Sequence, residues 1–203
     1  MLSRHGERVM VSEAEPRTIH IMQTNILNTD RLMLRLINPE IYTQVMTTYN
    51  DEAIKKYFGI TTTIELEQEK ARFRQGMTMA GRSFLYFHLL EKQTKEVMGW
   101  CGYHTWFIQH RRAEIGYVLN EERFKGKGYM KEALPPVINY GFATMNLHRI
   151  EALIAPANEP SLRLVKYLGF TREGLLREHY LKSGKMEDSV VFSLLESDPR
   201  GNF

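Results

Sequence analysis

Alternating apolar and polar positions predict most of the strands in this chain. Leu32, Leu34 and Leu36 are separated by arginine and methionine residues, and this period of two is typical of a strand buried on one face. Gly99 and Gly102 interrupt a longer run and indicate a bulge or a close backbone approach. The pattern predicts strands at residues 29–36, 84–90, 96–107, 112–119, 149–155, 170–176 and 188–195.

Helical spacing and capping residues predict the helices. Ile41 and Val45 recur at helical spacing, Thr62 and Glu65 form a capping-box pattern, and Asn158 is a favourable N-cap. The predicted helices are 40–49; 51–57, capped by Asp51; 64–79, ended by Gly81; one that starts near Lys127; and 159–168, ended by Gly169.

The order of these elements predicts one α+β domain. A strand and helices precede three strands of an antiparallel meander, and a helix, a strand, a helix and two strands follow. No repeat or linker divides the chain. We predict a domain at 29–197, a loosely held arm at 1–28 with an optional strand near 18–22, and a tail at 198–203.

Two glycines, Gly126 and Gly128, lie where the strand at 112–119 leads into a helix. They leave main-chain N–H groups uncovered at the positive end of the helix dipole, which favours an anion such as a pyrophosphate. The carboxylate of Glu114 on the strand adds an acid–base group. The spacing matches neither a P-loop nor GxGxxG, and a plain basic turn is the alternative.

Pro135 and Pro136 fall inside the helix after these glycines. Each removes a main-chain hydrogen bond, and an interior proline costs about 3 kcal/mol or more. We therefore predict a kink or break at residues 131–134, which leaves about two turns behind the anion site.

Composition limits the other functions. The net charge of +3 is too small to indicate nucleic-acid binding, and no apolar run is long enough for a membrane span or a signal peptide. Cys101 is alone, so no intrachain disulfide is expected, and we predict a cytoplasmic protein. His88, His104 and His110 lack metal-ligand spacing, so we expect no metal. We interpret Trp100, Tyr103, Trp106 and Phe107 as core and cleft wall.

Four segments carry a resemblance to a known family. Arg123 to Gly128 match the loop pattern Q/R-x-x-G-x-G/A of the GNAT N-acetyltransferases. The segments AEIGYVL, HRIEALIAPANEPS and YLGFTREGLLREHYLKSGKMEDSVVFSLL occur in the order typical of the branch that acetylates ribosomal-protein N-termini. Residues 29–195 thus resemble that branch of the family.

The resemblance implies a fold and a cosubstrate. The fold is the GNAT fold, a mostly antiparallel sheet of six to seven strands that splays between the strand ending at Leu119 and the strand starting at Arg149. Acetyl-CoA would lie in the opening, with its pyrophosphate on the amides of residues 125–129. The implied cofactor-binding residues are Val118, Arg123, Lys125, Gly126, Lys127, Gly128, Tyr129 and Asn158.

The resemblance also implies direct attack of an amine on the acetyl thioester. Glu114 is the candidate base, acting through a water, because amines are protonated near neutral pH. The alternative for Glu114 is an ion pair with Arg111 or Arg112.

Ser161 is the candidate donor of a proton to the leaving thiolate, with a serine that only caps the helix as the alternative. Val165 occupies the position where many family members carry a tyrosine donor. Tyr180 is a weaker donor candidate, which we place at the substrate mouth.

Two classes of function follow from this sequence. The first is an acetyl-CoA-dependent N-acetyltransferase that acts on a protein N-terminal α-amine, with a polyamine, an aminoglycoside or another small amine as the alternative acceptor. The second is a non-catalytic acyl-CoA-binding module, suggested by Val165 and the two prolines. The oligomeric state stays open, with a homodimer as one option.

Overall fold

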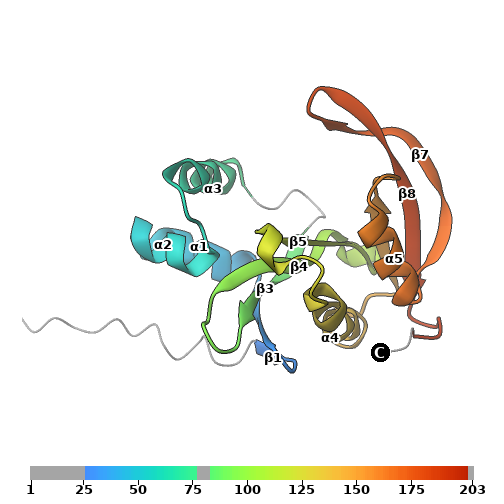
Figure 1. Cartoon of the computed structure of the whole chain (residues 1–203), viewed down its shortest axis with the longest axis horizontal. Helices are drawn as coiled ribbons and strands as arrows, with labels where there is room; N and C mark the ends of the chain where they lie inside the picture. The colour runs from blue at the N-terminus through green and yellow to red at the C-terminus, as the bar shows by residue number, and fades with distance from the viewer. Residues whose placement is uncertain (1–25, 77–82, 201–203) are drawn as a thin grey trace, which may run out of the picture.

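The elements of the chain form one sheet flanked by helices in the computed structural model, which describes residues 26–76 and 83–200 (Figure 1). The strands are β1 (Ile26–Asn28), β2 (Leu32–Ile37), β3 (Ser83–Glu91), β4 (Val97–Phe107), β5 (Arg112–Leu119), β6 (Arg149–Ile154), β7 (Thr171–Lys182) and β8 (Lys185–Leu195). The helices are α1 (Pro39–Thr48), α2 (Asp51–Phe58), α3 (Thr63–Gln75), α4 (Tyr129–Ala143) and α5 (Glu159–Tyr167), with short 3-10 turns η2 (Ile108–His110) and η3 (Glu122–Phe124).

The sheet has the strand order β1-β2-β3-β4-β5-β6-β8-β7, and only β5 and β6 are parallel neighbours. The predicted α+β fold with a mostly antiparallel sheet is confirmed. The sheet has eight described strands rather than six or seven, because Ile26–Asn28, predicted to belong to the arm, pairs with β2. The optional strand near 18–22 lies outside the described residues.

β5 and β6 separate soon after they begin. They pair over three residues, and the last pair joins Glu114 to Glu151. From Ile115 onward the edge of β5 that faces β6 has no strand partner, so its main-chain polar groups are left for another partner. The predicted splay is therefore confirmed.

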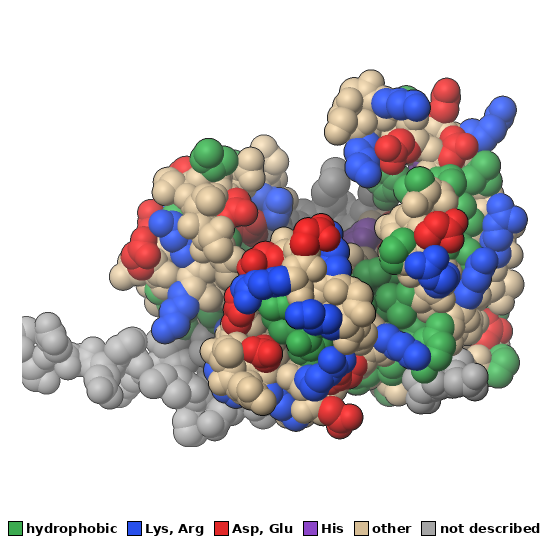
Figure 2. Space-filling model, in the orientation of Figure 1, with side chains coloured by type: hydrophobic (Ala, Val, Ile, Leu, Met, Phe, Trp, Pro, Cys, Tyr) green, Lys and Arg blue, Asp and Glu red, His purple; other side chains and the backbone are tan. Residues whose placement is uncertain are grey.

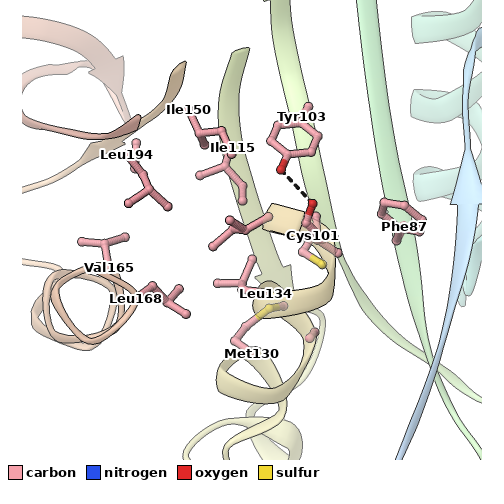
Figure 3. Close-up of a cluster of buried hydrophobic side chains, with 14 of the residues drawn as sticks. Phe87, Cys101, Tyr103, Ile115, Met130, Leu134, Ile150, Val165, Leu168 and Leu194 are labelled. Atoms are coloured by element: carbon pink, nitrogen blue, oxygen red, sulfur yellow. Dashed lines mark hydrogen bonds between the residues drawn. The ribbon is translucent and has the colours of Figure 1, made fainter. Parts of the chain in front are cut away.

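The main hydrophobic core lies between the sheet and helices α4 and α5. Figure 3 shows Ile115, Leu134, Ile150 and Leu194 converging there, and each is at most 5% exposed. The hydroxyl of Tyr103 donates to the Val137 carbonyl at 2.8 Å and ties β4 to α4. A second cluster lies under α1–α3 and is formed by Ile37, Tyr42, Val45, Ile54, Tyr57, Phe58, Leu66 and Phe84.

Two predicted helix ends need correction. Asn50, not Asp51, caps α2, because its side chain accepts from the Ala53 N–H at 2.9 Å and Asp51 is already the first helical residue. The capping box at the start of α3 is confirmed. α3 ends at its C-cap Gly76 rather than at Gly81, which lies outside the described residues.

α4 runs without interruption through Pro135 and Pro136, so the predicted interruption at residues 131–134 is wrong. The neighbouring Leu134 and Val137 are 1% and 0% exposed. Full burial of such a side chain stabilises the folded state by about 1.5–3 kcal/mol. Several buried side chains on this face of α4 together offset the free-energy cost of each proline. The helix therefore presents a full dipole behind the glycine loop.

The two glycines in β4 mark close backbone approaches, as predicted. A Cβ on Gly99 would lie 2.1 Å from the Val118 carbonyl oxygen, and one on Gly102 would lie 2.3 Å from the Tyr86 Cα. Both residues have a positive φ that favours glycine. These glycines let β4 pack tightly against the strands on either side of it.

Candidate active site

The loop before α4 presents free main-chain donors. Gly128 is the N-cap of α4 with a φ of 79°, and Gly126 has a φ of 71°. Among the described residues, no chain atom accepts a hydrogen bond from the N–H groups of 126–130. The N–H of Lys125, by contrast, donates to the Glu122 carbonyl at 3.0 Å. The predicted cradle is therefore open from Gly126 onward but excludes the Lys125 amide.

Arg31, a residue that the sequence analysis did not single out, fixes this loop from the far end of the chain. Its Nη1 donates to the Lys127 carbonyl at 3.0 Å, and its Nε donates to Glu132 Oε2 at 2.6 Å. The guanidinium lies 4.4 Å from the centre of the Tyr129 ring. These contacts hold the start of α4 in place before any ligand binds.

The three predicted loop cations differ in how free they are. Arg123 makes ion pairs with Glu96 and Glu121, which raise its pKa further. Lys125 pairs with the carboxylate three residues before it. Within the part of the chain that the structure describes, Lys127 alone of the three has no ion pair. Lys127 is therefore the cation most available to a phosphate.

Glu114 lies in β5 at the point where β6 departs. Burial first, and then the charge of Glu151, raise its pKa to about 7. The arginines named as alternative partners are engaged elsewhere, because Arg112 pairs with Glu151 at 2.9 Å and Arg111 with Glu196 at 3.2 Å. A carboxylate that titrates near neutral pH is suited to general-base work.

Two further side chains lie near this carboxylate. The Nδ1 of His104 is 3.7 Å from a Glu114 oxygen, which is too long for a hydrogen bond. Burial lowers the pKa of His104, so its ring is neutral at pH 7. Burial and then the charge of Glu114 raise the pKa of Tyr180, which places this 47% exposed phenol close to the base.

Ser161 and Tyr117 meet where α5 faces the open edge of β5. The Ser161 N–H donates to Asn158 Oδ1 at 3.3 Å, so Asn158 caps α5 as predicted. The buried Tyr117 hydroxyl has no hydrogen bond of standard geometry within the described residues. Burial raises the Tyr117 pKa, and the nearby Ser161 hydroxyl partly opposes this rise. Two hydroxyls are thus adjacent, although the sequence indicated only Ser161.

Val165 and Val118 differ sharply in their surroundings. Val165 is 1% exposed and lies among the core side chains beside Leu168 and Leu194 (Figure 3). A valine side chain has no polar hydrogen, so Val165 cannot serve as the proton donor. Val118 is 41% exposed and lies on the part of β5 that β6 leaves unpaired. It is therefore accessible to a ligand in the opening.

A cavity of about 490 Å³ lies on the sheet face below α2 and α3. It extends to His104, the neighbour of Glu114, and it is walled by aromatic rings. Figure 2 shows a hollow between the lobe formed by α1–α3 and the β7–β8 hairpin. The residues that line the cavity and matter below are Phe58, Glu69, Arg72, Tyr86, His88 and Trp100.

The splayed strands, the helix start with free amides and the carboxylate of pKa near 7 suit a phosphorylated carrier held beside a proton-transfer group. Comparisons with known proteins agree. Residues 31–171 match the family described as the Acetyltransferase (GNAT) domain. The chain therefore belongs to the GNAT acetyltransferases, a family that uses acetyl-CoA as cosubstrate, and it is an N-acetyltransferase.

Individual relatives are consistent with this assignment. The uncharacterized N-acetyltransferase p20 of Bacillus licheniformis is 36% identical over 177 residues, which is 86% of this chain and 98% of that protein. The ribosomal protein uS5-alanine N-acetyltransferase of Escherichia coli is 30% identical over 179 residues, 85% and 91% of the two chains. The solved spermidine/spermine N-acetyltransferase of Vibrio cholerae shares the fold with a TM-score of 0.60, at 21% identity over 82% and 94% of the chains.

Residues 26–76 and 83–200 contain no group of three or more histidine, cysteine, aspartate or glutamate side chains arranged to hold a metal ion. No helix in these same ranges is long and apolar enough to cross a membrane.

Proposed function

We propose that this protein transfers the acetyl group of acetyl-CoA to the N-terminal α-amine of a protein, with Glu114 as the general base. The observation that carries the proposal is the position of Glu114. A buried carboxylate of pKa about 7 lies in the last residue pair before β5 and β6 separate. An acyl-carrier arm in that opening would present its thioester beside this carboxylate.

In the proposed reaction the amine loses its proton to Glu114 through one water. The amine nitrogen then forms a bond to the thioester carbon, and the carbon–sulfur bond breaks. The electron pair of that bond goes to the sulfur of coenzyme A, and the resulting thiolate takes a proton from Ser161. The serine hydroxyl is restored by the second proton of the attacking nitrogen, which leaves a neutral amide. Asn158 holds the first turn of α5, and with it Ser161, through the cap at 3.3 Å.

The pair of hydroxyls gives a first prediction. Ser161→Ala should lower kcat about 100-fold, a typical value for a lost general acid, whereas Tyr117→Phe should lower it about tenfold because the phenol supports the serine. The double variant should be no slower than Ser161→Ala, since residues that act in one chain are not additive. Steady-state kinetics at saturating acetyl-CoA measures all three. A large loss in Tyr117→Phe with normal turnover in Ser161→Ala would reverse the two roles.

The identity of the acceptor has two candidates. The uS5-alanine relative covers nearly all of this chain and favours an α-amine of a protein. The spermidine/spermine enzyme shares the fold alone, and it motivates the polyamine alternative. A non-catalytic acyl-CoA-binding module would contradict the family assignment, and it predicts that acetyl-CoA binds without transfer.

One experiment separates these three readings. The protein is incubated with acetyl-CoA and either a peptide library with free N-termini or a mixture of polyamines and aminoglycosides. Mass spectrometry then detects the gain of one acetyl group. Transfer to peptide α-amines supports the proposal, transfer only to the small amines selects the alternative, and tight binding of acetyl-CoA with no transfer selects the module.

A further inference from the structure

His88 lies at the end of the aromatic cavity that is remote from Glu114. It is 4% exposed and is packed edge-on against the rings of Tyr57 and Phe58, with centroids 6.2 and 5.5 Å away. Its ring also lies 5.7 Å from Tyr86, a cavity wall residue. A polar side chain held this firmly presents a fixed edge to the cavity.

Arg35 fixes which nitrogen of His88 carries the proton. Arg35 Nη2 lies 3.1 Å from His88 Nδ1, and a guanidinium can only donate, so Nδ1 accepts. Burial and then the charge of Arg35 lower the His88 pKa to about 3, so the ring is neutral at working pH. The Nε2 atom therefore carries the proton. Within the described residues, the hydrogen-bond contact of the His88 ring is the one between Arg35 Nη2 and Nδ1.

The charge at this end of the cavity is positive. Arg35 makes no ion pair with a carboxylate in the described ranges, and its guanidinium lies 3.8 Å from the centre of the Tyr57 ring. Glu69 is the nearby cavity carboxylate, but its oxygens accept from Tyr42 at 2.5 Å and from Arg72 at 2.6 Å. A cationic group would meet a donor and an unbalanced positive charge here.

The cavity is also long. Glu114 lies opposite His104 in β4, and His88 lies opposite Trp100, four residues further along the same strand. With strands about 4.8 Å apart and a rise of about 3.3 Å per residue, the Cα atoms of Glu114 and His88 are about 16 Å apart. An extended peptide of about five residues covers that distance.

We infer that His88 is a specificity residue for peptide acceptors, and that its Nε2–H donates to a main-chain carbonyl a few residues after the acetylated amine. This inference rests on the proposed function and narrows its acceptor class. A peptide offers carbonyl oxygens at this distance. A polyamine of the same length offers only protonated amines, which have no lone pair to accept the hydrogen bond and are repelled by Arg35.

The test compares a hexapeptide with N-terminal alanine and spermidine as acceptors, in the wild type and in two variants. His88→Phe keeps a ring and removes the donor, and it should raise KM for the hexapeptide about tenfold at unchanged kcat and unchanged KM for acetyl-CoA. The same variant should leave spermidine kinetics unchanged or improved. His88→Gln restores a donor and should recover part of the hexapeptide affinity. His110→Phe, at an exposed histidine, is the matched control.

Several outcomes would overturn the inference. An unchanged hexapeptide KM in His88→Phe contradicts the inference and leaves the proposed function standing. A wild type that prefers spermidine contradicts both. If no acceptor is acetylated, calorimetry with hexapeptide and coenzyme A separates the two ideas. Weaker binding to His88→Phe than to the wild type supports the inference even though the proposed function fails, and equal or no binding overturns it.

If His88→Phe does not fold, the wild type is tested instead with hexapeptides in which one amide bond is replaced by an alkene. One of them should bind the wild type about tenfold more weakly, and no loss at any position overturns the inference.

Discussion

Glu114→Gln is expected to lower kcat by a factor of about 100 to 10,000, the range for loss of a general base. Glutamine has nearly the same shape but cannot take a proton at neutral pH. The affinity for acetyl-CoA should stay unchanged, because in the proposed site the glycine loop and not Glu114 holds the carrier. Steady-state acetyl transfer and calorimetry with acetyl-CoA measure the two quantities. Equal turnover in the variant and the wild type would remove Glu114 from the mechanism.

The pH dependence adds a signed test of the same residue. The base must be ionised, so kcat/KM should rise as the pH increases through the Glu114 pKa of about 7. Glu114→Gln should lack this step and keep only the ionisation of the acceptor amine, near about 7.7–8.0 for an α-amine. Glu151→Gln is the diagnostic control. It removes a negative charge that raises the Glu114 pKa, so the step should move to lower pH.

Stability gives an independent check that the Glu114→Gln protein is folded. A pKa raised in the folded state means that ionised Glu114 weakens the fold, and stability falls as the pH rises through about 7. The glutamine variant lacks this loss. Its Tm at pH 8 should therefore equal or exceed that of the wild type in a thermal melt followed by circular dichroism.

Gly126→Val is expected to weaken acetyl-CoA binding about 100-fold or more, which corresponds to about 2.7 kcal/mol. Gly126 has a φ of 71°, and no atom lies within 4 Å of a Cβ built there, so the space next to the backbone is open. Its branched side chain would nevertheless strain the left-handed backbone and cover the free amides that we propose as the pyrophosphate site. Calorimetry with acetyl-CoA measures the loss.

Gly184→Val is the matched control for this prediction. Gly184 also has a positive φ, of 79°, and open space around its Cβ, but it lies in the β7–β8 turn. Both variants carry similar backbone strain, and only Gly126→Val should lose acetyl-CoA. If both lose affinity alike, or neither does, the glycine loop is not the pyrophosphate site.

The parts of the site that the sequence could predict depend on patterns of residues close together in the chain. Gly126 and Gly128 belong to a six-residue pattern that predicts the start of α4. The alternation of side chains along β5 predicts that Glu114 lies beside the opening. The break predicted at residues 131–134 was wrong for the opposite reason. A local penalty was outweighed by burial of the same helix against the sheet, which depends on residues far away in the chain.

The residues that the sequence analysis missed all act through distant partners. Arg31 reaches the Lys127 carbonyl across 96 positions. Arg35 contacts Nδ1 of His88, which is 53 positions away in the sequence. This contact leaves the proton of the neutral His88 ring on Nε2. Tyr117 gains its significance from Ser161 on another element. No periodicity or motif records such pairs, so they emerge only when the sheet register is known.

A crystal structure of the protein with acetyl-CoA bound would be the most direct test of the whole account. We predict the pyrophosphate within hydrogen-bonding distance of the N–H groups between Gly126 and Met130. The pantetheine arm should lie between β5 and β6, with the thioester carbon one water away from Glu114. Acetyl-CoA bound elsewhere, or bound in the opening with its thioester directed away from Glu114, would contradict the account.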